Sequence, residues 1–183
     1  SIFMAVSKAL CKSTMLRDRG ADLGGLLAQM NTEVSRDNPA ALFVTAFAGV
    51  LDLHTGALDY CNAGQENPWL VSPATGIARL VDGDGPPLCA VDDFTYRPGH
   101  VRMATGDMLC VVSDGITEAA NAAGELYGAA RVERALASAP SARAAVDALR
   151  RDVAAFVGTA VQSDDMTVLA LQWRGAGADI PQR

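Results

Sequence analysis

The hydrophobic pattern changes its period at about residue 41, and this change is the strongest constraint on the fold. Before it, the segments 1–18 and 22–36 carry apolar residues at helical spacing. After it, residues 41–53 are rich in Val, Phe and Thr, which is typical of a β-strand. A chain that passes from helices to strands in this way is expected to form a layered α+β fold, with helices covering a mainly antiparallel sheet system.

Each predicted helix has an apolar face that can be read from the sequence. The first is expected to bury one broad face made of Phe3, Met4, Ala5, Leu10, Cys11 and Met15. The second is expected to start with Asp22 as its N-cap and to bury a stripe of Leu23, Leu26, Leu27, Met30 and Val34.

A meander of short strands is predicted for the middle of the chain. The turn 54–56 connects the strand 41–53 to a hairpin partner at 57–64. Residues 82–93 are predicted to be a loop, because Gly-Pro-Pro suits no regular element. The remaining strands are expected at 68–71, 77–81, 94–103 (broken by Pro98-Gly99), 108–113 and 166–173. The later helices are expected at 128–139 and, capped by Ser141, at 141–158.

Composition limits the classes of function. Half of the residues are apolar and the net charge is −6, which argues for a folded domain and against general binding to nucleic acid or an anionic membrane surface. No apolar run approaches the ~18 residues of a membrane span. The four cysteines form no C-x-x-C pair and lie near neither histidine, so free thiols in a reducing, cytoplasmic setting are favoured over a disulfide or a zinc site.

Two acidic groups stand at strand ends. The apolar run Met108–Val112 leads into Asp114 and Gly115, while Asp164 and Asp165 precede the last strand. If these strands are antiparallel neighbours, Asp114 and Asp164 meet at one edge of the sheet and repel unless they share a proton or a cation. Oxygen ligands without cysteine or histidine suit Mg²⁺ or Mn²⁺, and Gly115 is expected to leave space for a metal-bound water. The alternative, from spacing alone, is that these acids only form turns.

Other phosphoryl or acyl chemistries have less support. The sequence contains neither a G-x-S-x-G elbow nor a G-x-x-x-x-G-K-[ST] phosphate loop. The stretch VVSDGIT shares its Asp-Gly with the aspartate loop of haloacid dehalogenase-type phosphatases. That loop needs a nucleophilic aspartate two residues earlier, where this sequence has Val112.

Three ordered segments together resemble a known family. Residues 43–71, 106–128 and 163–172 resemble the metal-dependent protein phosphatases (PPM family), in the bacterial branch of stage II sporulation protein E and the sigma-regulator phosphatases. The resemblance implies a layered α-β-β-α sandwich. It also implies that residues 1–174 are the C-terminal portion of a single phosphatase domain without its front strands, and that 175–183 form a flexible tail.

The resemblance also implies roles for individual residues. Asp114 and Asp164 match metal ligands, and the complete domain would hold two Mn²⁺ or Mg²⁺ ions. Gly115 and Asp165 would lie beside the metal as backbone or supporting residues, and Thr117 would cap the short helix after the strand. The residues of a turn on the substrate side would be Asn62, Gly64 and Gln65, with Gln65 standing where this branch usually has histidine.

The implied activity is hydrolysis of phosphoserine or phosphothreonine on a regulatory protein, by water that the two ions activate. A phosphorylated anti-anti-sigma factor is the implied kind of partner, and a homodimer is left open. The resemblance implies that this sequence starts after the family's two early Gly-Asp motifs, which supply further ligands, so the chain alone is expected to be weakly active. The alternative is a non-catalytic signalling or interaction module with an incomplete metal site.

Overall fold

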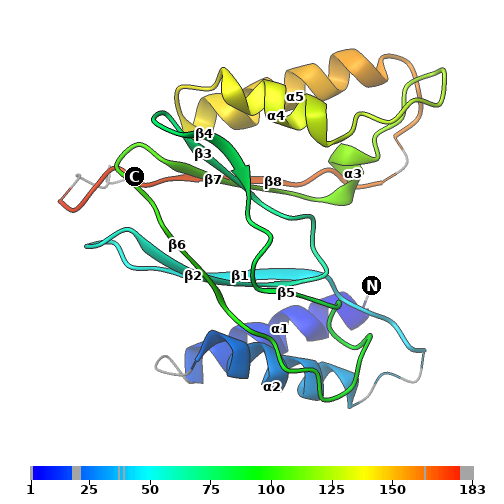
Figure 1. Ribbon diagram of the computed structural model, residues 1–183. Coiled ribbons are helices and arrows are strands. Elements are labelled where there is room, and N and C mark those ends of the chain that lie inside the picture. Colours follow the sequence, from blue (N-terminus) through cyan, green and yellow to red (C-terminus); the bar gives the residue numbers. More distant parts are fainter. Residues whose placement is uncertain (1, 18–21, 37, 39, 163, 178–183) are drawn as a thin grey trace. The chain divides into compact units, whose positions relative to one another are not determined.

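The computed structural model describes residues 2–17, 22–36, 38, 40–162 and 164–177 (Figure 1). The chain divides into two compact units. The first unit comprises Ser1–Asp52, Ala57–Gln65 and Val81–Val101. The second comprises Leu53–Gly56, Glu66–Leu80 and Arg102–Arg183.

The first unit is a small sheet with two helices. Its elements are α1 (Ile2–Arg17), α2 (Leu23–Ser35), β1 (Ala46–Leu51), β2 (Ala57–Ala63), β5 (Asp84–Gly85) and β6 (Gly99–Arg102). The strands β1 and β2 form an antiparallel hairpin, in which Ala46 lies opposite Ala63. The short β5 pairs in parallel with β2, and β6 also pairs with β2.

The helix α2 forms as the sequence predicts. The Asp22 carboxylate accepts a hydrogen bond from the Gly25 amide at 3.1 Å, which caps the helix. All five residues of the expected stripe are buried, and four of them form a core with Cys61 and Ala63 of β2: Leu23, Leu26, Leu27 and Met30.

The helix α1 was predicted correctly, but its expected buried face was right only in part, since Phe3, Leu10 and Cys11 are half-buried while Ala5 is exposed. Met15 of the expected face is 36% exposed, whereas Ser7 and Thr14 are buried. These two residues and the half-buried Cys11 are spaced by four and three positions, so they share the face that α1 turns inward. Packing against α2 decides which face of α1 is covered. The apolar residues are spread too evenly around this helix for the sequence to show that face.

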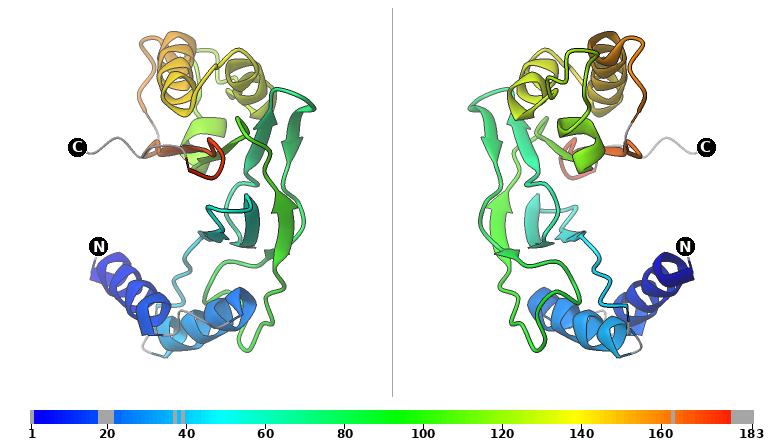
Figure 2. Two further views of the ribbon diagram at one scale, coloured as in Figure 1. Left: turned by 90° about the vertical axis from the view of Figure 1, so that its left-hand side faces the viewer. Right: turned by 90° about the vertical axis from the view of Figure 1, so that its right-hand side faces the viewer.

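The second unit is a four-stranded antiparallel sheet with two long helices on one face. Its strands have the order β4-β3-β7-β8. Its elements are β3 (Trp69–Ser72), β4 (Gly76–Arg79), β7 (Met108–Val112), α3 (Asp114–Thr117), α4 (Ala129–Ala137), α5 (Ala142–Val157) and β8 (Val168–Gln172). Figures 1 and 2 show α4 and α5 side by side over this sheet.

The core of the second unit lies between β7 and the helices α4 and α5. Alternate residues of β7, which are Met108, Cys110 and Val112, point into it. The helices contribute Val132, Leu136, Ala145, Leu149 and Val153. The Ser141 hydroxyl caps α5 as predicted, since it accepts a hydrogen bond from the Ala144 amide at 3.2 Å.

Several predicted boundaries were wrong. The strand predicted at 41–53 is a strand only over β1, and the predicted loop 82–93 contains the two-residue strand β5. The strand predicted at 94–103 is reduced to β6, which starts directly after Pro98. A strand extends only as far as a neighbouring strand pairs with it, and a single sequence does not show where that pairing ends.

All four cysteines are free thiols, and Cys61 and Cys110 are buried. Burial raises the pKa of Cys61 to about 11 and that of Cys110 to about 12, because the apolar core disfavours the thiolate. Of the helices in the described residues, none combines the length and the apolar character needed to cross a bilayer.

Candidate active site

The ends of β7 and β8 meet as the sequence predicts. The two strands are antiparallel neighbours, and Val112 lies opposite Val168. Beyond them, the Ser113 amide donates to the Thr167 carbonyl at 3.0 Å, and the Thr167 amide donates to the Ser113 hydroxyl at 2.9 Å. These bonds bring the segment after β7, which carries Asp114, next to the segment before β8, which carries Asp164.

Gly115 shows how closely the two segments approach. A Cβ atom at this position would lie 2.4 Å from the Asp165 carbonyl oxygen and 3.5 Å from the Asp164 carbonyl carbon. The Ser113 hydroxyl also donates to the Asp165 carbonyl at 3.1 Å. The main chain of residue 165 therefore occupies the position that a side chain at 115 would take, and the space that we expected for a metal-bound water stays a prediction. Glycine is needed at 115 because the neighbouring backbone comes so close.

The two candidate ligands have available oxygen atoms. The Oδ1 atom of Asp114 accepts from the Gly115 amide at 2.9 Å, and that of Asp164 accepts from the Asp165 amide at 2.7 Å. Both side chains are exposed. In the described part of the chain, neither Oδ2 atom has a hydrogen-bond or ion-pair partner.

The type of donor atom at this site, a carboxylate oxygen, fits a hard divalent cation. Mg²⁺ and Mn²⁺ favour carboxylate oxygens, and Mg²⁺ keeps several of its own waters, for which an exposed site leaves room. The number of donors is small, since the described residues contain no group of three or more His, Cys, Asp or Glu side chains that could hold a metal ion. The side chain of Asp165 is also exposed, and only its main chain contacts Ser113 and Gly115.

The one-turn helix α3 carries Asp114 as its first residue. Ser113 occupies the N-cap position, and Thr117 is the last residue of the helix, so the expected capping role of Thr117 was wrong. The Thr117 hydroxyl is buried, 3.1 Å from Glu66 Oε1 and 3.2 Å from the main-chain oxygen of Asp114.

We did not predict from the sequence that Glu66 contacts the helix α3. The other oxygen of its carboxylate pairs with Arg79 of β4 at 3.1 Å. The Arg79 guanidinium lies 4.3 Å from the ring centre of Trp69, whose Nε1 donates to Glu133 of α4 at 3.2 Å. The only signal for Glu66 in the sequence is its place directly after the Asn-Ala-Gly-Gln turn.

That turn is closed by its own side chain. The Asn62 amide donates to the Gln65 carbonyl at 2.8 Å, and its oxygen accepts from the Gln65 amide at 2.8 Å. Gly64 has a φ of 72°, and a Cβ there would lie 2.4 Å from Pro87. Asn62 and Gly64 thus have structural reasons to be present, and the substrate role predicted for this turn stays a prediction.

The described residues near Asp114 offer no ready covalent nucleophile. Cys110 is fully buried, and its raised pKa of about 12 keeps it protonated at neutral pH. Ser113 both donates and accepts a main-chain hydrogen bond, so its hydroxyl is already used.

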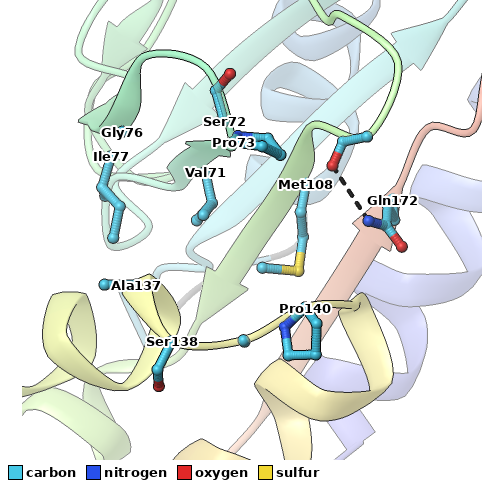
Figure 3. A pocket seen from close by; sticks show the side chains of 12 residues that line it. Val71, Ser72, Pro73, Gly76, Ile77, Met108, Ala137, Ser138, Pro140 and Gln172 are labelled. Carbon is cyan, nitrogen blue, oxygen red and sulfur yellow. Dashed lines mark hydrogen bonds between the residues drawn. The ribbon is translucent and has the colours of Figure 1, made fainter.

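A hollow of about 410 Å³ lies at the other end of β7, around Met108 (Figure 3). The Gln172 amide donates to the Gly106 carbonyl at 3.1 Å beside it. None of the residues that line it is ionisable: Val71, Ser72, Pro73, Gly76, Ile77, Gly106, Met108, Ala137, Ser138, Ala139, Pro140 and Gln172. It therefore supplies no acid, base or metal ligand, and the chemistry is better placed at Asp114.

Comparison with known proteins agrees with this reading of the fold. The chain has the mixed α+β fold of PP2C-type phosphatase domains. It aligns with the crystal structure of the RsbU and RsbW domains of Rv1364c from Mycobacterium tuberculosis at a TM-score of 0.76, with 21% identity, over 97% of this chain and 51% of that one. It also aligns with RsbX in complex with magnesium at a TM-score of 0.66, with 15% identity, over 93% of this chain and 74% of that one.

The family follows from the sequence match. The family model described as stage II sporulation protein E (SpoIIE) matches residues 1–174, and the chain belongs to this family. Protein IcfG of Synechocystis sp. (strain ATCC 27184 / PCC 6803 / Kazusa) is 30% identical over 132 residues, which are 72% of this chain and 21% of that protein. The phosphoserine phosphatase RsbU of Bacillus subtilis (strain 168) is 25% identical over 119 residues, 62% of this chain and 36% of that protein. The chain thus covers about a fifth of the length of Protein IcfG and about a third of the length of RsbU.

Proposed function

We propose that this chain is the C-terminal part of a metal-dependent protein phosphatase that hydrolyses phosphoserine or phosphothreonine on a regulatory protein. The observation that carries the proposal is the contact of Gly115 with the main chain of Asp164 and Asp165, which brings two exposed carboxylates to one sheet edge. The family match and the relative named phosphoserine phosphatase support the same reaction class.

In this proposal, Asp114 and Asp164 hold the divalent ions through their free oxygen atoms. Bound Mg²⁺ or Mn²⁺ ions supply a water activated near neutral pH and positive charge for the phosphoryl oxygens. The chain itself contributes the rigid placement of the two carboxylates, since hydrogen bonds between residues 113, 165 and 167 lock the strand ends together. Further ligands are needed for two ions, and we propose that a preceding segment of the same domain supplies them.

The exposure of Asp114 and Asp164 also bears on the substrate. A phosphate carried on the surface of a folded protein can reach carboxylates that stand at the edge of a sheet, whereas a deep pocket would exclude it. We propose that the protein acts in sigma-factor signalling in the cytoplasm, with an anti-anti-sigma factor as its substrate, and the likeness to RsbU and to the RsbU and RsbW domains supports this.

The test is Mn²⁺-dependent phosphate release from a phosphoserine protein or peptide by the whole natural protein. The variants Asp114→Asn and Asp164→Asn keep the side-chain shape but remove the charge, so we expect turnover and Mn²⁺ affinity to fall at least about tenfold. Asp147→Asn on the exposed side of α5 is the matched control and should behave like the wild type. Near-normal rates in both ligand variants would refute the proposal.

The second candidate is a non-catalytic module that keeps the fold. Its support is that the described residues contain no third metal-binding side chain beside the two aspartates. Such a module would bind the phosphorylated partner equally well with and without Mn²⁺. A pull-down of a phosphoserine protein in the presence of a chelator separates the two functions.

A further inference from the structure

We propose that Glu66 is a positioning residue of this metal centre, because it holds α3 in the orientation that presents Asp114 to the ion. The inference rests on the proposed function, since it treats Asp114 as a ligand. It gives Glu66 a role in the placement of a residue that lies 48 positions further along the chain.

The helix α3 cannot fix its own orientation. It has only four residues, and helices of this length are not stable by themselves. The N-cap residue Ser113 makes no capping hydrogen bond with its side chain. The direction of α3 therefore depends on contacts from outside the helix, which are the core packing of Ile116, the close approach at Gly115 and the hydrogen bond of Thr117.

Thr117 lies between Glu66 and the main chain of Asp114, and its single hydroxyl hydrogen is within reach of both acceptors. Its hydroxyl is 3.1 Å from the Glu66 carboxylate and 3.2 Å from the Asp114 carbonyl oxygen. The side chain is 7% exposed, so water competes little for this hydroxyl. A shift of Thr117 would move the peptide group that carries the Asp114 carboxylate.

Glu66 is itself held by the core of the second unit. One carboxylate oxygen of Glu66 accepts a hydrogen bond from the Thr117 hydroxyl, and the other accepts one from Arg79. Arg79 and Glu66 are each 29% exposed, which shields their ion pair in part. Arg79 stacks on the fully buried Trp69, and the indole of Trp69 donates to Glu133. The position of Thr117 is thus tied to the sheet and to α4.

The variants follow from this geometry. Arg79 and Thr117 both donate to Glu66, so Glu66→Leu, whose side chain has no acceptor and no donor, loses both contacts. Thr117→Val removes the donor and keeps the shape, whereas Thr117→Ser keeps the donor. Asp147→Asn, which removes an exposed acidic partner of Arg143 on α5, is the matched control for loss of a negative charge.

Two measurements on the purified protein test the proposal. The first is hydrogen exchange of the Glu118 amide without metal, because this amide donates to the Asp114 carbonyl at 2.7 Å and reports the opening of α3. The second is the Mn²⁺ dissociation constant by calorimetry. In Glu66→Leu and Thr117→Val we expect exchange to accelerate about tenfold or more, and Mn²⁺ affinity to fall by ~10- to 100-fold, the usual effect of losing a residue that orients a ligand. Thr117→Ser and Asp147→Asn should match the wild type.

Unchanged exchange in Glu66→Leu would overturn the proposal. Faster exchange with wild-type Mn²⁺ affinity would also overturn it, because Glu66 would then serve stability alone. The variant Asp114→Asn, measured in the same series, judges the proposed function separately. If Asp114→Asn abolishes Mn²⁺ binding and Glu66→Leu leaves Mn²⁺ affinity unchanged, only the role of Glu66 fails; if Asp114→Asn binds Mn²⁺ normally, the metal site itself fails.

Discussion

Gly115→Ala is the sharpest test of how the two strand ends meet. The added Cβ would lie 2.4 Å from the Asp165 carbonyl oxygen, whereas ordinary contacts begin at 3.4 Å. The main chain at 165 must therefore retreat by about 1 Å, which stretches its 3.1 Å hydrogen bond from Ser113. The obstacle is backbone, so a change of side-chain rotamer cannot relieve the clash.

The expected cost follows from two opposing effects. Overpacking of this kind costs ~1–3 kcal/mol, while replacing glycine by alanine in a helix returns ~0.5–1 kcal/mol. The net loss is about 1–2 kcal/mol, which lowers the melting temperature of a chain of this size by roughly 2–8 °C. Because Asp164 moves with the main chain at 165, Mn²⁺ affinity should fall as well.

Gly25→Ala supplies the control. Gly25 is also helical, but a Cβ there would have only Asp22 Oδ2 as a neighbour, at 3.8 Å. This variant should gain ~0.5–1 kcal/mol. Thermal and urea unfolding followed by circular dichroism measures both variants. A Gly115→Ala protein that melts at or above the wild-type temperature would show that the two segments do not pack as described.

Three further predictions concern metal binding, alkaline stability and capping. Since the described residues contain no group of three or more His, Cys, Asp or Glu side chains that could hold a metal ion, the 183-residue chain alone should bind Mn²⁺ weakly, and tight binding of two ions in calorimetry would contradict this. The folded-state pKa of Cys61, about 11, and that of Cys110, about 12, lie above the ordinary 9.0, so stability present below pH 9 should fall as the pH rises toward 12; urea midpoints that stay constant over this range would disprove the linkage. Ser141→Ala removes the cap of α5 and should cost ~1 kcal/mol in urea unfolding, and an unchanged midpoint would argue against the capping bond.

Part of the site could be predicted from the sequence because it depends on local patterns. The apolar run Met108–Val112 and the strand before Trp173 are both recognisable, and antiparallel pairing of two such strands puts the end of one beside the start of the other. The N-caps Asp22 and Ser141 were predictable for the same reason, since a cap acts on an amide only three residues away.

The other features of the site depended on contacts between distant parts of the chain. The sequence by itself determined the order of helices and strands, the α+β class and the pairing of the strand ends near Asp114 and Asp164, because each follows from hydrophobic period and strand direction. Only the tertiary structure decided that main chain fills the space at Gly115 and that Glu66 reaches Thr117, 51 residues away. The physical reason is that neither contact has a repeating pattern: each arises from the packing of segments whose separation in the sequence carries no signal of their closeness in space.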